Sequence, residues 1–384
     1  MAWNETCVMD LKVSLVSVWL SGCYTKTMLA KKYGISRPTV NKWLDRYDED
    51  GAEGLYDQSR QPHSCPHQTP DEVIAELIKL KQGFPYWGPK KINDLLKLQK
   101  PWLKCPADST TGQILKKAGL VKAKKRSSKV SAYPSKLTKS ERSCEVWNID
   151  FKGQAKLGNG HWCYPLTITD DFSRFLLCLE AQKSTKAKPV KENLERLFTD
   201  YGLPDVIKSD NGTPFASRAV GGLSNLSIWL IKLGITPERI EKGKPTQNGR
   251  HERMHRTLKM EAMKPMKYSF SAQQQAFNRF KDEYNCLRSH ESLDRKRPVE
   301  SFKKSNREYK PKHLEVNYGL EMEIRSVRCN GTIKWKGHLL YCGEILAKEK
   351  VGLKEVHDGV YEIYFSFMHI GYLNERYMQI NRIK

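Results

Sequence analysis

The chain has 384 residues, 39% of them hydrophobic, which is enough for several domains with cores of their own. Lysine and arginine outnumber aspartate and glutamate by 66 to 43, and the formal net charge of +23 calls for a polyanionic partner, first of all nucleic acid. An anionic membrane surface is the other candidate. However, no apolar run reaches the roughly 18 residues of a spanning helix, and the first residues lack a signal-peptide pattern, so we expect no membrane partner.

Ten cysteines are scattered along the chain, and no two of them have the C-x-x-C spacing. Because disulfides persist mainly in oxidising compartments, this scatter is typical of reduced thiols in a cytosolic protein. Together with the charge, it predicts a cytoplasmic protein associated with the nucleoid.

Residues 1–60 have the pattern of an all-α helix-turn-helix domain. Gly34 follows a short helical pattern where a left-handed residue is favoured, and Ser36 can cap the helix that comes next. In a helix-turn-helix the second helix enters the major groove of DNA. The alternative is an ordinary helical hairpin. The outer face of the second helix, which we expect to bind DNA, consists of Arg37, Thr39, Asn41, Lys42 and Arg46.

Two further segments precede the next change of pattern. Residues 70–121 form a second helical region, either another helix-turn-helix-like domain or a structural spacer. Residues 122–142 hold eight basic residues against one acidic residue and have few large apolar groups. Such a segment cannot bury enough surface to fold alone. We expect a basic linker, which either lies along phosphates or is a flexible tether.

Residues 143–310 alternate strand and helix patterns. Asp150 lies near the centre of an apolar strand pattern, where a carboxylate is costly unless it has a cationic partner. Asp210 lies at the C-terminal end of a short strand, where functional groups gather in open α/β sheets. Glu252 lies in the first turn of a predicted helix. Three carboxylates on two strands and one helix can meet at one point.

A cluster of carboxylates suits hard divalent cations, because Mg²⁺ and Mn²⁺ prefer oxygen ligands and keep some of their waters. Two such ions about 3.5–4 Å apart can stabilise both the attacking and the leaving oxygen of an in-line phosphoryl transfer. The DNA phosphate would supply the remaining ligands.

Three blocks surround these carboxylates: Trp147-Asn-Ile-Asp150-Phe, Ser209-Asp210-Asn-Gly-Thr-Pro-Phe and Gln247-Asn-Gly-Arg-His-Glu252-Arg. In this order they resemble the core of DDE-type insertion-sequence transposases, whose retroviral-integrase-like core has an α/β ribonuclease H-like fold. The resemblance implies that Asp150, Asp210 and Glu252 are the catalytic residues. It also implies that they are the ligands of two Mg²⁺ or Mn²⁺ ions.

One departure concerns the spacing of the second and third carboxylates. Asp210 and Glu252 are separated by 41 residues, more than the commonest spacing in that family. We expect a loop at residues 218–226 to absorb the extra length. Weaker alternatives remain for the third carboxylate at Glu241 and Glu261, and for the first at Asp170 and Asp171, in a turn that favours aspartate for its geometry alone.

On the predicted helix of Glu252, residues three, four and seven positions later should share its face. These residues are His255, Arg256 and Lys259, and we expect them to bind the same DNA. The alternative is a surface ion pair between Glu252 and Arg256, which contributes little.

Residues 320–384 alternate polar and apolar residues between turns such as Asn330-Gly331, which predicts a small antiparallel β-barrel. Its function can be contact with DNA or with protein.

The hypothesis for the whole chain follows from these parts. We expect a DNA transposase that binds the double-stranded ends of an insertion element, hydrolyses a strand to free 3′-hydroxyls and joins them to target DNA. Two ends must meet one target, so we expect a homo-oligomer on DNA. The alternatives are a catalytically silent DNA-binding regulator, which would have lost a carboxylate, and a nuclease that cuts without joining.

Overall fold

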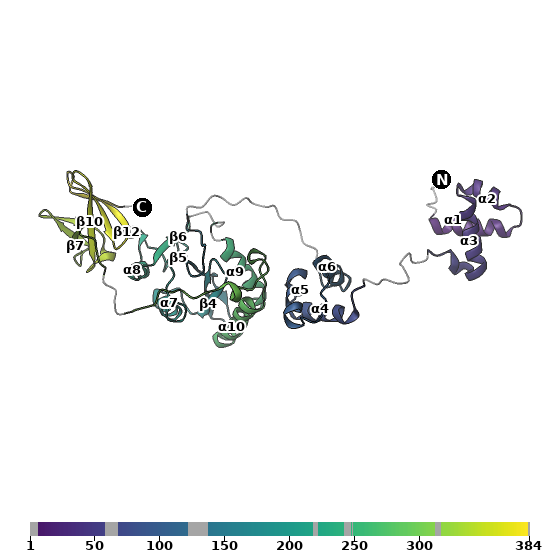
Figure 1. Ribbon diagram of the computed structural model, residues 1–384, viewed down its shortest axis with the longest axis horizontal. Helices are drawn as coiled ribbons and strands as arrows, with labels where there is room; N and C mark the ends of the chain where they lie inside the picture. The colour runs from purple at the N-terminus through teal and green to yellow at the C-terminus, as the bar shows by residue number, and fades with distance from the viewer. Residues whose placement is uncertain are drawn as a thin grey trace. The chain divides into compact units, whose positions relative to one another are not determined.

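The structure is a computed structural model, and it describes residues 7–57, 68–121, 137–217, 222–241, 247, 249–311 and 316–382. The chain divides into two compact units, Met1–Gln68 and Thr69–Lys384, and each is described by itself. Figure 1 shows their elements. Among the described residues, no helix is long and apolar enough to cross a membrane.

The first unit is a bundle of three helices. They are α1 (Val8–Leu20), α2 (Lys26–Tyr33) and α3 (Arg37–Asp50), followed by a 3₁₀ turn, η1 (Gly51–Leu55). Gly34 takes the left-handed conformation at the end of α2, with φ of 66°, and the Ser36 side chain accepts a hydrogen bond from the Thr39 backbone N–H at the start of α3. The predicted helix-turn-helix pattern is confirmed. Its core consists of Leu15, Val16, Leu29, Val40, Leu44 and Leu55.

The second unit begins with three more helices, α4 (Asp71–Gly83), α5 (Pro89–Gln99) and α6 (Asp108–Lys117). They pack around a core that includes Leu77, Trp87 and Ile92, and Leu287 from much later in the chain packs against the same core. The second helical region is therefore packed against the last part of the predicted catalytic core, residues 143–310.

The central sheet consists of β1 (Val146–Phe151), β2 (Ala155–Lys156), β3 (Trp162–Asp170), β4 (Leu176–Gln182), β5 (Val206–Ser209) and β6 (Thr236–Arg239). Its order is β2-β3-β1-β5-β6, with β4 also paired to β3. The β1–β3 and β3–β4 pairs are antiparallel, and the β1–β5 and β5–β6 pairs are parallel. The carboxyl ends of β1 and β5 therefore meet at one edge of the sheet.

Helices cover both faces of this sheet. One core joins β1, β3 and β4 to α7 (Ala187–Tyr201) and α8 (Asn225–Lys232). A second core joins Leu176 and Leu179 of β4 to α9 (Gly249–Glu261) and α10 (Phe270–Cys286). The short elements η4 (Glu291–Leu293) and α11 (Pro298–Ser301) follow. This three-layer arrangement agrees with the expected α/β core.

The predicted basic linker, residues 122–142, falls mostly outside the described residues, which resume at 137. Its last part contacts the central sheet. The Thr138 side chain and backbone N–H donate to Glu238, and Ser140 Oγ donates to Asp171 Oδ2 at 2.6 Å. At least from Thr138 onward, this segment is bound to the core.

The C-terminal domain contains β7 (Glu323–Ser326), β8 (Thr332–Trp335), β9 (His338–Tyr341), η5 (Glu344–Leu346), β10 (Lys350–His357), β11 (Val360–Phe365), β12 (Met368–Asn374) and β13 (Gln379–Arg382). Five strands form an antiparallel sheet in the order β13-β12-β11-β10-β7, and β8 and β9 form a separate hairpin. Within the described residues this sheet has two edges and does not close. The expected small barrel is thus observed as an open sheet that shares one core with the hairpin.

The same core extends to the catalytic domain. It includes Leu223 and, on α8, Ile228 and Ile231. Lys232 Nζ, at the end of α8, lies 2.6 Å from Glu349 Oε1. The C-terminal sheet is therefore packed on the side of the central domain that carries α8.

Candidate active site

Asp150 and Asp210 lie side by side at the carboxyl end of the central sheet. The parallel register of β1 and β5 runs from Val146 opposite Val206 to Ile149 opposite Ser209, so its next step pairs Asp150 with Asp210. Neighbouring strands are about 4.8 Å apart, and residues opposite each other project to the same side. The two carboxylates therefore belong to one site.

The loop after β5 holds the Asp210 side chain. Asp210 Oδ1 accepts a hydrogen bond of 3.0 Å from the Gly212 backbone N–H. A side chain at Gly212 would place its Cβ 3.0 Å from Asp210 Oδ2, closer than nearly all real contacts. The glycine in the Asp-Asn-Gly sequence thus leaves room for this carboxylate.

Glu252 approaches the pair from the first turn of α9. Its side chain is exposed, and it acts electrostatically on Asp150. Burial raises the pKa of Asp150 to about 7, and the charges of Asp210 and then Glu252 add to the rise. Asp210 and Glu252 act on Asp150 as like charges, so a divalent cation with oxygen ligands fits the site chemically and electrostatically, although the three carboxylates do not all offer oxygens within 4.8 Å of one another.

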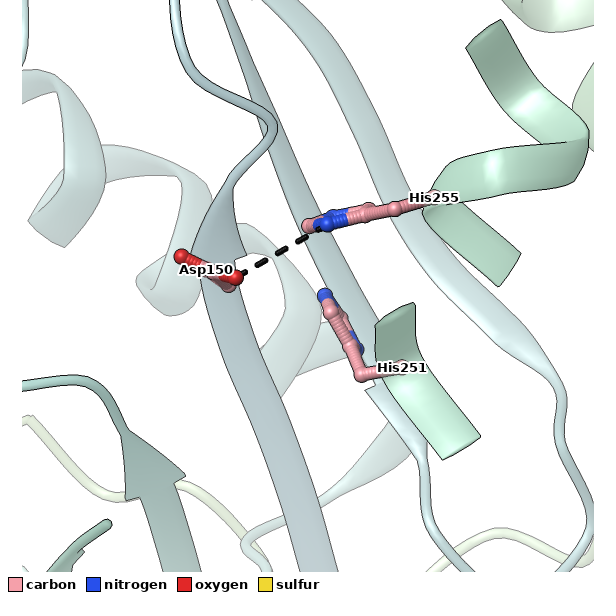
Figure 2. Close-up of side chains that lie close together, drawn as sticks. All are labelled: Asp150, His251 and His255. Atoms are coloured by element: carbon pink, nitrogen blue, oxygen red, sulfur yellow. Dashed lines mark ion pairs between the residues drawn. The ribbon is translucent and has the colours of Figure 1, made fainter. Parts of the chain in front are cut away.

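Two histidines on the inner face of α9 complete the surroundings of Asp150 (Figure 2). His251 Nε2 and His255 Nε2 lie 2.8 Å and 2.7 Å from the hydroxyl oxygen of Thr167, and His251 Nδ1 lies 2.8 Å from that of Thr169. Burial lowers the pKa of His251 to about 3 and also lowers the pKa of His255. Both imidazoles are neutral near neutral pH.

The hydrogen bonds assign the tautomers of these rings. Thr167 Oγ1 has one proton, and it lies 2.9 Å from the backbone carbonyl oxygen of Asp150, which can only accept. Both imidazoles must then donate to Thr167 through Nε2–H, which leaves His255 Nδ1 without a proton. That nitrogen lies 3.7 Å from Asp150 Oδ2, and because the ring is neutral this contact is not a charge pair.

Asp150, His251 and His255 also offer ligand atoms within 4.8 Å of one another. Both nitrogens of His251, however, are already engaged by Thr167 and Thr169. A metal ion on His251 would have to break one of these buried hydrogen bonds. The carboxylate set therefore fits a divalent cation better than this histidine set. Sequence reasoning missed this network, although histidines four positions apart on α9 and threonines two apart on β3 were visible signals.

The alternative acidic residues are engaged elsewhere. Asp170 accepts from the backbone N–H of Ser173 in its own turn and from that of Cys144, which precedes β1. Asp171 pairs with Arg250, at 2.7 Å. The other two alternatives also have partners: Glu261 pairs with Arg288, and Glu241 bonds Gln247.

Helix α9 separates the residues expected to share the face of Glu252. Glu252, Arg256 and Lys259 are exposed, but His255 is only 4% exposed and its ring is turned to Thr167. The expectation of an outward His255 is corrected, because three positions along a helix turn it 60° from Glu252 towards the sheet, as 3.6 residues make one turn. Asn248, which precedes α9 in the third of the three sequence blocks, lies outside the described residues.

On α3, the residues expected to bind DNA differ in exposure. Arg37 and Lys42 are exposed, whereas Thr39 and Arg46 are partly buried. Thr39 Oγ1 lies 2.8 Å from Ser36 Oγ, and the Arg46 guanidinium lies over the Trp43 ring. Asn41 is also partly buried, and its Oδ1 is enclosed without a hydrogen-bond partner in the described part of the chain, so its carbonyl is turned inward.

Comparison with known families agrees with this architecture. Residues 140–245 and 233–298 match integrase core domains. Residues 14–63 match a helix-turn-helix domain, residues 39–115 a homeodomain-like domain, and residues 322–381 the C-terminal domain of IS481 family transposases.

Individual relatives agree as well. A 31.7 kDa protein of insertion element IS407 from Burkholderia multivorans is 31% identical over 41% of this chain and 54% of its own length. A 39.2 kDa protein of insertion element IS476 from Xanthomonas euvesicatoria is 26% identical over 62% of this chain and 66% of its own length. The chain thus spans less than two thirds of each relative.

Among solved structures, the intasome of simian T-cell lymphotropic virus in complex with PP2A regulatory subunit B56 gamma matches 80% of this chain and 99% of its own, with 17% identity and a TM-score of 0.38. The magnesium complex of the HTLV-2 integrase catalytic core matches 42% of this chain and 99% of its own, with 16% identity and a TM-score of 0.34. The chain thus carries integrase core domains and the C-terminal domain of IS481 family transposases, and with its insertion-element relatives it is similar to DDE transposases that have an integrase-like core.

Proposed function

We propose that this chain is a DNA transposase that cuts one strand at each end of an insertion element and joins the freed 3′-hydroxyls to target DNA. The observation that carries the proposal is the parallel pairing of β1 with β5, which sets Asp150 beside Asp210, with Glu252 close enough to raise the pKa of Asp150. Three carboxylates that converge on one edge of the sheet fit phosphoryl transfer better than binding alone.

In this proposal Asp150, Asp210 and Glu252 hold divalent cations, Mg²⁺ or Mn²⁺, and two ions suit the chemistry. When bound, the cations supply Lewis-acid stabilisation of the attacking and leaving oxygens. The Gly212 backbone N–H orients the Asp210 carboxylate. The neutral pair His251 and His255, tied to Thr167, orients Asp150.

The remaining domains bind and align the DNA in this proposal. Arg37 and Lys42 on the exposed side of α3 contact the element ends, with Thr39, Asn41 and Arg46 as further candidates, and Arg256 and Lys259 contact DNA beside Glu252. The C-terminal sheet contacts DNA or protein. A homo-oligomer holds two ends at one target.

A strand-transfer assay tests the proposal. Full-length protein is mixed with Mg²⁺ or Mn²⁺, a duplex carrying the DNA that flanks the gene, and a supercoiled plasmid. We expect the wild type to join duplex to plasmid, and Asp210→Asn and Glu252→Gln to bind DNA without joining it. Asp282→Asn and Glu192→Gln are matched controls, because both residues are exposed on helices away from the cluster.

Two outcomes would replace the proposal with its alternatives. Wild-type binding without cutting under either metal would favour the regulator, and cutting without joining would favour a nuclease. Full activity of Glu252→Gln beside an inactive Asp210→Asn would instead leave the reaction in place and move the third carboxylate elsewhere.

A further inference from the structure

A pocket of 270 Å³ lies on the side of α9 that faces away from the carboxylate cluster. Its wall contains Lys91 of α5, Arg174 of the turn after β3, Arg253 of α9, and Arg288 and His290 of the segment after α10. We call it the cationic pocket. It is built jointly by the second helical region and the catalytic domain.

The charge of this pocket is not balanced by its wall. No carboxylate is among its lining residues in the described part of the chain, and its five cationic side chains are Lys91, Arg174, Arg250, Arg253 and Arg288. Two of the five have partners outside it, since Arg250 pairs with Asp171 and Arg288 with Glu261. The other three, Lys91, Arg174 and Arg253, form no ion pair with any described residue.

Three nitrogens on the wall are enclosed without a hydrogen-bond partner among the described residues: Arg174 Nη1, Arg288 Nε and His290 Nε2. The two arginine nitrogens are donors, and a buried donor left unpaired costs about 1–3 kcal/mol, so both of them at one place call for a ligand that accepts hydrogen bonds. Arg288 is held rigidly, because its guanidinium lies between the rings of Trp87 and Tyr284 at 4.8 Å and 5.8 Å.

Arg174 adds a backbone observation. Its φ of 63° is left-handed, a conformation that few residues other than glycine adopt and that costs about 1–3 kcal/mol. Such a residue persists only when its surroundings enforce it, and it is then a candidate for function. Burial and the nearby Arg250 lower the pKa of Arg174, which means that the surroundings of this side chain disfavour its charged form.

The start of α5 points to the same kind of ligand. A second cavity, of 520 Å³, shares Lys91, Arg253 and His290 with the cationic pocket, and Gly88 and Pro89 line it. Gly88 caps α5 without a side-chain hydrogen bond, so the positive end of the helix is free to meet an anion. The carboxylates in this second cavity, Asp94, Asp108 and Glu291, are each paired with Arg295 or Lys90.

We propose that the cationic pocket binds a backbone phosphate of DNA, at a site separate from the reacting phosphate. Arg174 and Arg253 take the phosphate oxygens with Lys91, and the adjoining cavity has room for the neighbouring sugar. This assignment rests on the proposed function for its choice of DNA over another phosphate compound. Because α9 is roughly 10 Å across, a phosphate in the pocket lies about that far from Glu252 and positions the strand for cutting.

The test compares two double variants of the full chain that lose the same charge. Lys91→Gln with Arg253→Gln alters the pocket, and Lys97→Gln with Arg279→Gln alters exposed positions on α5 and α10. Both are made in the Asp210→Asn background, so that only binding is measured. Affinity for a duplex is then followed against salt concentration.

A lost phosphate contact lowers the salt slope by about one. We expect this change in the pocket variant, with affinity about tenfold weaker at low salt and melting temperature unchanged. The control should change less than threefold. Equal effects in both double variants, or none in either, would overturn the proposal. If the pocket variant does not fold, Arg253→Gln alone repeats the test, because that residue is exposed.

Two further measurements distinguish this proposal from the binding of free phosphate and from the transposase proposal. If millimolar inorganic phosphate raises the melting temperature of the wild type but not of the pocket variant, while duplex binding is equal, the pocket binds a free anion and the DNA assignment is overturned. If the pocket variant loses salt slope but the wild type never joins DNA, the phosphate site stands and the transposase proposal fails.

Discussion

The two sides of helix α9 differ in charge and in the residues that surround them. Towards the sheet, His251 and His255 are buried and neutral and lie beside Asp150. Towards the second helical region, Arg253 lines a pocket with cations and no carboxylate in its described wall. In the two proposals made above, one helix borders a site for cations and, on its opposite side, a site for anions. A DNA strand that crosses α9 would contact both sites. Metal cations would neutralise its reacting phosphate, and the cationic side chains of the pocket would bind a phosphate further along its backbone.

The largest expected effect is on the carboxylate side. Asp150→Asn should reduce strand joining on the order of 10²–10³-fold, because it removes a charge that holds the cations. The same change should stabilise the metal-free protein at pH 8 by about 2–4 kcal/mol. The pKa of Asp150 is raised to about 7 from 3.8, so its charge destabilises the fold increasingly between those two pH values.

Thermal unfolding at pH 8 and at pH 3.5 checks the sign. The stabilisation should be full at pH 8 and nearly absent at pH 3.5, where Asp150 is protonated in the folded state and mostly protonated in the unfolded state. Mg²⁺ should raise the melting temperature of the wild type more than that of the variant. A variant that is no more stable at pH 8 would show that the carboxylates do not repel one another.

The next effect concerns the neutral histidines. Thr167→Val keeps the shape of the side chain but leaves His251 Nε2 and His255 Nε2 without their acceptor, at a cost of about 2–3 kcal/mol. Thr169→Val is the matched control, since it removes one hydrogen bond to His251 and should cost about 1 kcal/mol. Chemical denaturation measures both. Equal losses would mean that Thr167 does not join the two rings.

On the pocket side, Arg295 connects the second helical region to the catalytic domain. Its Nε lies 2.9 Å from Asp94 Oδ1 and its Nη1 lies 2.8 Å from Asp108 Oδ2. Arg295→Lys should destabilise the protein by about 1–2 kcal/mol, because a lysine cannot reach two carboxylates with one planar group. Arg297→Lys, at a local pair with Glu300, should cost less than about 0.5 kcal/mol. A wild-type melting curve for Arg295→Lys would contradict the connection.

The smallest effect is a pH dependence in the cationic pocket. Burial and then Arg288 lower the pKa of Lys91 to about 8, although Glu261, Glu291 and Asp94 oppose the shift. Lys91 therefore loses its charge as the pH rises through 8, and duplex affinity should fall about threefold more between pH 7 and 9 than in Lys91→Arg. Parallel binding curves at the two pH values measure it. An identical fall in both proteins would remove Lys91 from the phosphate site.

Much of the fold could be predicted from local sequence patterns. The helix-turn-helix was predictable because Gly34 and Ser36 act on their immediate neighbours, and helix ends depend on such short-range chemistry. That Asp150 lies in a strand, Asp210 directly after one and Glu252 in a helix was predictable for the same reason, although Asp150 lies near the end of β1 and not near its centre. Their assignment as ligands remains a proposal.

The rest depends on contacts between segments far apart in the chain. Whether His255 faces DNA or the sheet is decided by Thr167, 88 residues earlier, and the sheet in the C-terminal domain stays open because its first and last strands do not pair. The cationic pocket joins Lys91, Arg174 and Arg253, which no local pattern connects. Sequence by itself determined the elements and the candidate carboxylates, because hydrophobic period and capping are local. Only the tertiary structure decided which faces are buried and which charges meet, because packing alone brings them together.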